Sequence, residues 1–173
     1  MTDPRAQATY QVRLDWGTGA LERLAAAEIV VVVDAIGTNQ AFIDRVSERS
    51  AGATVFVGSL RNATATAQAI LDEQVARGGR TAINLVLAGD EGRFAVEDYL
   101  AAGAIGDALS ARGIDHTAPD VAVATEGFRP LGRAVKHLLS ASAAGLELSA
   151  SGRRDEVIAA AQVDAEAEAT RWK

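Results

Sequence analysis

Acidic residues gather in one short stretch of the chain, and their spacing places them where α/β proteins usually bind ligands. The stretch begins with a short apolar run, Ile83 to Leu87, of the kind that lies inside a parallel sheet. A polar turn follows, and then a helix whose apolar residues recur at helical spacing as far as Leu109. Carboxylates occupy the turn and the start of the helix, at Asp90, Glu91, Glu97 and Asp98. They are suited to bind Mg²⁺, or alternatively they form a solvated loop and compensate the helix dipole.

A fifth carboxylate, Asp34, comes directly after another strand. Ile29 to Val33 is an all-apolar, β-branched run and predicts a central strand. The turn that follows, Gly37 to Asn39, is expected to cap a helix that runs to Arg49.

The loop from Gly58 to Asn62 leads from a strand into a helix and predicts an anion site. Free backbone N–H groups and the helix dipole attract anions there, and Arg61 adds a forked donor. Ser59 and Asn62 are further donors. The alternative is that Asn62 only caps the helix and that Arg61 is a surface charge.

The alternation of strands and helices predicts an α/β fold with a mostly parallel central sheet between two helical layers. We expect one domain over residues 1–173, with residues 1–9 disordered. The strands are expected at Tyr10–Trp16, Ile29–Val33, Thr54–Val57 and Ile83–Ala88. The last third is expected to be helical, with one helix opening at Pro130, a loop from Ser149 to Arg153 and a final helix from Asp155 to about Trp172. If the strands are parallel, the three polar loops meet at one edge of the sheet.

Composition excludes several functions. The formal charge of −6 disfavours binding to nucleic acid or to an anionic membrane. Because the chain has no cysteine, thiol catalysis and Cys-ligated zinc are excluded. The longest apolar run is too short to span a bilayer, and the first residues carry no signal-peptide pattern. We expect a cytoplasmic protein.

Two central blocks resemble the 2-phosphosulfolactate phosphatase family, also called ComB-like. They are V-G-S-L-R-N-A-T-A-T-A from Val57 to Ala67 and L-A-G-D-E-G-R-F-A-V-E-D-Y-L-A-A-G-A from Leu87 to Ala104. The stretch from Tyr10 to Asp34 is similar to the start of actinobacterial members, and Ser149 to Arg153 is similar to their C-terminus.

The resemblance implies a three-layer α/β/α fold and Mg²⁺-dependent release of phosphate from 2-phosphosulfolactate. It also implies site residues by position. Asp34 matches an acidic residue after the first core strand, while Glu97 and Asp98 match an acidic helix start. Ser59, Arg61 and Asn62 match the strand-to-helix loop, and Thr38 and Asn39 resemble part of a later loop of the family.

The chain departs from the family pattern after Asp34. The family continues there with an Arg and a Ser/Thr pair, whereas this chain has Ala35 to Gln40, and a middle segment of the family is missing.

Two functions therefore remain open. The first is an Mg²⁺-dependent phosphatase of a small phosphorylated acid. In it, Ser59, Arg61, Asn62, Thr38 and Asn39 bind the substrate, Asp34, Glu97 and Asp98 hold the metal, and Asp34, Asp90 and Glu91 are the catalytic acids. The second is a non-catalytic anion-binding or assembly protein on the same scaffold. We also expect a homo-oligomer, because a four-stranded sheet leaves its edges and apolar helix faces poorly covered.

Overall fold

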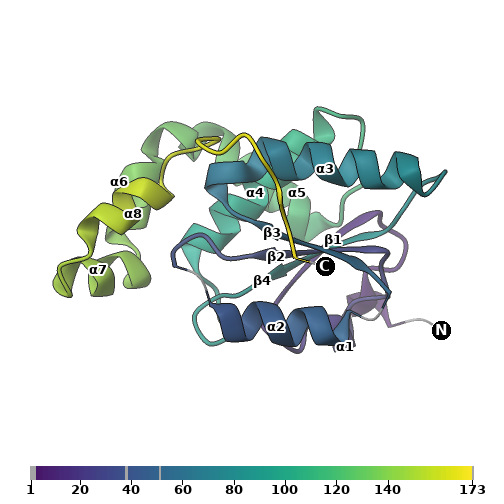
Figure 1. Cartoon of the computed structure of the whole chain (residues 1–173), viewed down its shortest axis with the longest axis horizontal. Coiled ribbons are helices and arrows are strands. Elements are labelled where there is room, and N and C mark those ends of the chain that lie inside the picture. The colour runs from purple at the N-terminus through teal and green to yellow at the C-terminus, as the bar shows by residue number, and fades with distance from the viewer. Residues whose placement is uncertain (1–2, 38, 51, 173) are drawn as a thin grey trace.

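A five-stranded sheet lies at the centre of the computed structural model, which describes residues 3–37, 39–50 and 52–172 (Figure 1). The order of the strands across the sheet is β1-β4-β2-β3-β5. The first four strands are parallel, and β5 is antiparallel to β3. Their bounds are β1 Val12–Trp16, β2 Ile29–Val33, β3 Thr54–Gly58, β4 Ile83–Leu87 and β5 Thr170–Arg171.

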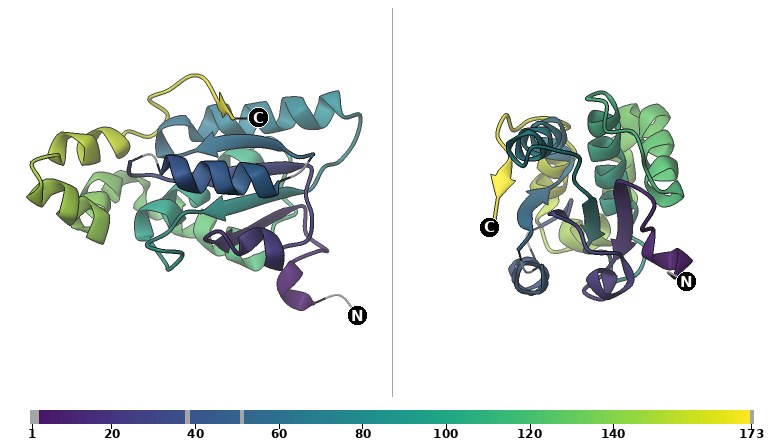
Figure 2. Two further views of the ribbon diagram at one scale, coloured as in Figure 1. Left: turned by 60° about the horizontal axis from the view of Figure 1, so that its bottom comes forward. Right: turned by 90° about the vertical axis from the view of Figure 1, so that its right-hand side faces the viewer.

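Helices cover both faces of the sheet, which confirms the three-layer α/β/α prediction (Figure 2). One face carries α1 (Ala20–Arg23) and α2 (Gln40–Arg49), and the other carries α3 (Ala63–Ala76), α4 (Val96–Ser110) and α5 (Pro119–Leu131). The last three helices, α6 (Val135–Ala141), α7 (Ala143–Ala150) and α8 (Arg154–Ala160), extend beyond the carboxyl ends of the strands, and we call them the helical arm. Short 3₁₀ turns are η1 (Pro4–Ala6), η2 (Leu60–Asn62) and η3 (Gly132–Ala134).

Strand β2 is buried on both faces because all five of its residues are apolar and β-branched. Its residues alternate between two cores. Ile29, Val31 and Val33 pack into the larger core with α3, α4 and α5, and Val30 and Val32 pack into the smaller core with α2. This burial fixes the carboxyl end of β2, and thereby Asp34, in the middle of the sheet.

Helix α4 is enclosed by other elements along most of its length, which explains its scarcity of polar residues. Ten of its fifteen residues are buried. Two glycines allow α5 to pack closely against it: a Cβ on Gly103 would overlap the carbonyl oxygen of Ala124, and a Cβ on Gly106 would overlap the hydroxyl of Thr125. The close contact between α4 and α5 holds the first turn of α4, with its two acids, against the strand ends.

Both edges of the sheet are covered. On the β1 edge, the side-chain amide of Gln7 accepts a hydrogen bond from Leu14 N (3.0 Å) and donates one to Leu14 O (2.9 Å), as a neighbouring strand would. On the other edge, β5 pairs with β3. Within the segment expected to be disordered, Pro4–Ala6 form η1 and Gln7 bonds to β1, whereas residues 1 and 2 lie outside the described part. On the β3 side the described sheet ends at β5, whose two residues are exposed, so poorly covered edges are a weaker reason for a homo-oligomer than expected.

Two expectations for the last third of the chain are wrong. Pro130 does not open a helix: it lies in the last turn of α5, which ends one residue later and is followed by η3. The final helix is only α8, and residues 161–172, which we call the C-terminal strap, run back along η2 and α3 to form β5. The expected loop at Ser149 is shorter than predicted, because α7 continues to Ala150. No helix among the described residues is long and apolar enough to cross a membrane.

Candidate functional site

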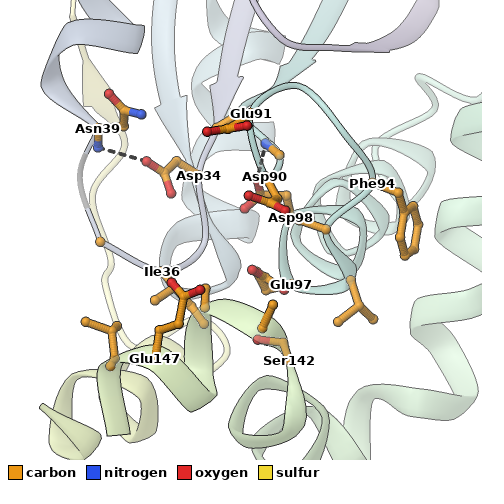
Figure 3. Close-up of a pocket in the computed structure, with 18 of the residues that line it drawn as sticks. Asp34, Ile36, Asn39, Asp90, Glu91, Phe94, Glu97, Asp98, Ser142 and Glu147 are labelled. Carbon is orange, nitrogen blue, oxygen red and sulfur yellow. Dashed lines mark hydrogen bonds between the residues drawn. The ribbon is translucent and has the colours of Figure 1, made fainter. Parts of the chain in front are cut away.

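A cavity of about 750 Å³ opens at the carboxyl ends of β2 and β4 and faces the helical arm (Figure 3). Its floor comes from the loops after the two strands and from the first turn of α4, and its opposite wall comes from α7 and the turn before α8. The connections of β2 and β4 leave on opposite faces of the sheet, which is where open α/β sheets bind ligands. Six acidic residues contribute to the lining: Asp34, Asp90, Glu91, Glu97, Asp98 and Glu147.

Asp98 joins the two loops that form the floor. Its Oδ1 accepts a hydrogen bond from Ala35 N after β2 (2.8 Å), and its Oδ2 accepts one from Gly89 N after β4 (2.7 Å). Only 4% of the residue is exposed. Burial raises the pKa of Asp98 to about 7, and the nearby charges of Asp34 and Glu97 add to the rise, while the two amide hydrogen bonds oppose it.

Asp34 lies beside Asp98 and points into the larger cavity (Figure 3). One of its oxygens accepts a hydrogen bond from Asn39 N (2.9 Å), whose own side chain caps α2 through Phe42 N. Burial raises the pKa of Asp34 to about 6, the hydrogen bond from Asn39 lowers it, and the charge of Glu97 raises it further. Glu97 is also buried, and no hydrogen bond to its side chain is present among the described residues.

The carboxylates of Asp34 and Glu97 fit a magnesium ion that takes its remaining ligands from water and substrate. Among the described residues, no group of three or more acidic or histidine side chains is placed so as to hold a metal ion. Mg²⁺ commonly uses only one or two carboxylates and takes its remaining ligands from phosphate and water. Asp34 keeps one oxygen free of backbone hydrogen bonds in the described part of the chain, and Glu97 lies close enough to raise its pKa. Both oxygens of Asp98 are already bound to amides.

Asp90 and Glu91 line the cavity from an exposed turn. Arg93 pairs with Asp90 (2.9 Å) and lies 3.8 Å from Glu91. These two acids are therefore held at the rim, away from the buried carboxylates of Asp34 and Asp98, and their catalytic role stays a prediction.

The predicted anion loop lines a second, smaller cavity of about 370 Å³ on the other side of the β2 loop. Ser59 and Asn62 bond to each other in this loop: Asn62 Oδ1 accepts from Ser59 N (2.9 Å), and its Nδ2 donates to Val57 O (3.1 Å). The side chain of Asn62 therefore does not cap α3, and Ser59 instead caps η2 through Arg61 N.

Carboxylates of the C-terminal strap already bind the donors of this loop. Arg61 Nε donates to Glu166 (2.7 Å), and its Nη1 donates to the carbonyl of Ala159 (2.6 Å). At the first turn of α3, Asp164 accepts from the backbone N of Thr64 (2.8 Å) and from its hydroxyl (2.7 Å). The strap thus occupies the places that a bound anion would take at Arg61 and at the helix N-terminus.

The structure brings the predicted residues together around the β2 loop, but on two sides of it. Asp34 borders both cavities. Asn39, Asp90, Glu91, Glu97 and Asp98 line the larger cavity, whereas Ser59, Arg61 and Asn62 line the smaller one. Thr38 lies outside the described residues.

Residues of the helical arm were missed as site residues. Ser142, Glu147 and Arg153 line the larger cavity, and Figure 3 shows Ser142 and Glu147 facing the acids of the sheet edge. The similarity of Ser149 to Arg153 to the family's C-terminus was the signal that would have identified Arg153.

A family model matches most of the chain. The model of the 2-phosphosulpholactate phosphatase family matches residues 37–168 of the 173-residue chain. The matched range includes the acidic start of α4, the loop from Gly58 to Asn62 and most of the helical arm and strap, and Asp34 lies just before it. No curated protein sequence matches the chain.

Proposed function

Because the chain belongs to the 2-phosphosulpholactate phosphatase family, we propose that it is an Mg²⁺-dependent phosphatase of 2-phosphosulfolactate or a similar small phosphorylated acid. The observation that carries the proposal is the set of three carboxylates at the floor of the larger cavity. Burial raises the pKa values of Asp34 and Asp98, and the charge of Glu97 beside them raises both further. A bound cation relieves such repulsion, and perturbed acids in a cleft are typical of functional sites.

Asp34 and Glu97 would hold the magnesium ion in this proposal. The bound ion supplies positive charge beside the phosphoryl oxygens and so lowers the repulsion that an anionic ester meets among the acids of the cavity. Asp98 acts as a positioning residue, because its two amide hydrogen bonds set the distance between the loop that carries Asp34 and the loop that carries Asp90 and Glu91.

Hydrolysis of the ester needs water to attack phosphorus and the alkoxide oxygen to leave with a proton. Asp90 and Glu91 are the candidates to accept the proton of the attacking water, since they line the same cavity and are exposed to solvent.

A phosphate-release assay over small phosphorylated acids, with Mg²⁺ or with a chelator, tests the proposal. We expect release only with the metal. Asp34→Asn and Glu97→Gln are expected to lower kcat/KM by about 10- to 100-fold or more, because each removes a ligand charge. Asp44→Asn, on the exposed side of α2, is the matched control and should leave the rate unchanged. Full activity in both Asp34→Asn and Glu97→Gln would contradict the proposed site.

The second candidate function is a non-catalytic anion-binding or assembly protein. The filled anion loop favours the loss of catalysis in this candidate, because the chain's own carboxylates bind Arg61 and the start of α3, which were predicted to bind the substrate. Thermal-shift titration separates the two functions. Stabilisation by phosphate but not by Mg²⁺, together with no turnover of any phosphoester, would support the non-catalytic protein. Joint stabilisation by Mg²⁺ and a phosphoester, with phosphate released, would exclude it.

A further inference from the structure

The larger cavity contains one cationic side chain among the described residues that line it. Six carboxylates surround the space, and Arg153 is the only Arg or Lys in the lining. A phosphorylated acid carries two anionic groups, and a metal at Asp34 and Glu97 would bind one of them, the phosphate. The other acid group then needs a positive partner, because it would otherwise lie among carboxylates of like charge.

The fold fixes Arg153 opposite the strand ends. It follows the turn between α7 and α8, and its backbone N donates to Leu148 O (2.8 Å). The helical arm is anchored to the larger core by buried Leu139 and Val157, which are fully shielded from solvent. Within the arm, Gly145 permits close contact with α6, since a Cβ there would overlap the carbonyl oxygen of Leu139. A well-packed arm therefore sets the position of the guanidinium.

The guanidinium is oriented and still has donors to offer. Glu156 accepts two hydrogen bonds from it, one from Nε and one from Nη2, each 2.7 Å long. Guanidinium has five N–H donors, so three are not used by the hydrogen bonds of the described residues. Its side chain is 55% exposed and borders the cavity, so a ligand there reaches it without rearrangement of the core. Ser142 and Ser151 line the same wall, but their hydroxyls donate to the carbonyl oxygens of Leu139 (2.9 Å) and Leu148 (2.8 Å), so the guanidinium is the donor that this wall offers.

We propose that Arg153 binds the second acid group, carboxylate or sulfonate, of the phosphorylated substrate and makes the cavity selective for phosphomonoesters that carry such a group. This assignment rests on the proposed phosphatase function. A planar, forked donor suits these oxyanions, because two parallel N–H···O bonds can form. The ion pair with Glu156 orients the guanidinium of Arg153 before the substrate binds, which reduces the entropy lost on binding.

Two esters of nearly equal size test the assignment: 2-phospholactate, which carries a carboxylate, and propane-1,2-diol 2-phosphate, which carries a hydroxyl instead. Phosphate release is measured with Mg²⁺ for the full chain and for Arg153→Gln. We expect KM for 2-phospholactate to rise about 10- to 100-fold in the variant, the range for a lost hydrogen bond to a charged group. The neutral ester should change less than about threefold. Arg154→Gln removes the same charge from the next residue, which is exposed and does not line the cavity, and should alter neither ester.

Binding of the two esters, measured by calorimetry with Mg²⁺, decides the assignment separately from catalysis. If the full chain releases no phosphate from either ester, the proposed function fails. If 2-phospholactate also binds the full chain and Arg153→Gln equally, the role of Arg153 fails. If Arg153→Gln weakens the binding of both esters equally, the assignment is likewise overturned, because the residue would then act on the phosphate or on the fold. Selective loss of the acidic ester supports it.

Discussion

Asp98 has a structural role that its neighbour Glu97 does not share. Both are buried acids at the start of α4, but only Asp98 has hydrogen bonds to the loops on either side. The difference makes them a matched pair for mutation, since each can be replaced by its amide with little change in shape.

We predict that Asp98→Asn lowers the free energy of unfolding by about 1–3 kcal/mol, because the side-chain NH₂ would face a backbone N–H and leave it unpaired. Glu97→Gln should leave stability unchanged or raise it, since it removes a repelling charge and breaks no hydrogen bond of the described residues. Urea denaturation at neutral pH measures both. Equal effects of the two substitutions would show that Asp98 does not clamp the loops.

The raised pKa of Asp34 predicts how stability depends on pH. Its pKa rises from an ordinary value of 3.8 to about 6 on folding, so between these values the folded state binds more protons than the unfolded state. The contribution of Asp34 to the free energy of unfolding therefore falls as pH rises through this window, and it is lowest above pH 6.

We predict that Asp34→Asn, which stays neutral, gains stability relative to the original chain as pH rises from about 4 to about 7 in the absence of metal. Thermal unfolding across this range, with a chelator present, measures the difference. Saturating Mg²⁺ should reduce it, because the ion favours the charged carboxylate. A difference that is constant with pH would show that Asp34 is not perturbed.

At the scale of elements, the packing of α5 on α4 depends on two glycines. We predict that Gly103→Ala destabilises the fold by about 1–3 kcal/mol, because the added Cβ overlaps the backbone of α5 at Ala124. Gly127→Ala is the control: it lies inside α5 with no atom near the place of a Cβ, and should stabilise by about 0.5–1 kcal/mol. Chemical denaturation distinguishes the two, and stabilisation by Gly103→Ala would contradict the close contact.

Elements with a strong local pattern could be predicted from the sequence. Ile29 to Val33 is β-branched throughout and forms β2 with the predicted bounds, and Asn39 caps α2 as predicted. Because parallel strands end at one edge, the meeting of the loops at Asp34 and Asp98 also followed from the order of the elements.

Tertiary contacts decided the parts that the sequence did not predict. The alanine-rich, acidic segment after Asp155 has helical propensity, yet its end is extended because Asp164 and Glu166 bind Thr64 and Arg61 and Trp172 N bonds to Val55 O. The docking of the helical arm over the cavity depends in the same way on buried contacts between distant residues. The similarity of Ser149 to Arg153 to the family's C-terminus marks Arg153 in the sequence, but its place in the lining of the larger cavity follows from that docking and was seen only in the structure.

At the scale of the whole molecule, the state of assembly is open to direct measurement. The covered sheet edges leave the helix faces as the surfaces through which a homo-oligomer would form. An oligomer stays our prediction, and such an assembly could cover exposed apolar side chains such as Val75 and Val123, which are 70% and 62% exposed. Light scattering at high protein concentration tests this, and the mass of a single chain would contradict it.

The C-terminal strap makes the anion loop a site with a built-in competitor. Glu166 is tethered to the same chain as Arg61, and a tethered group acts at an effective concentration of about millimolar or more. A free phosphate must reach a comparable concentration before it displaces Glu166. We therefore expect phosphate to stabilise the intact chain at this loop only in the millimolar range, and Glu166→Gln to lower that concentration. In a cell, the occupancy of this loop by phosphate would change with large changes in phosphate concentration and hardly at all with small ones.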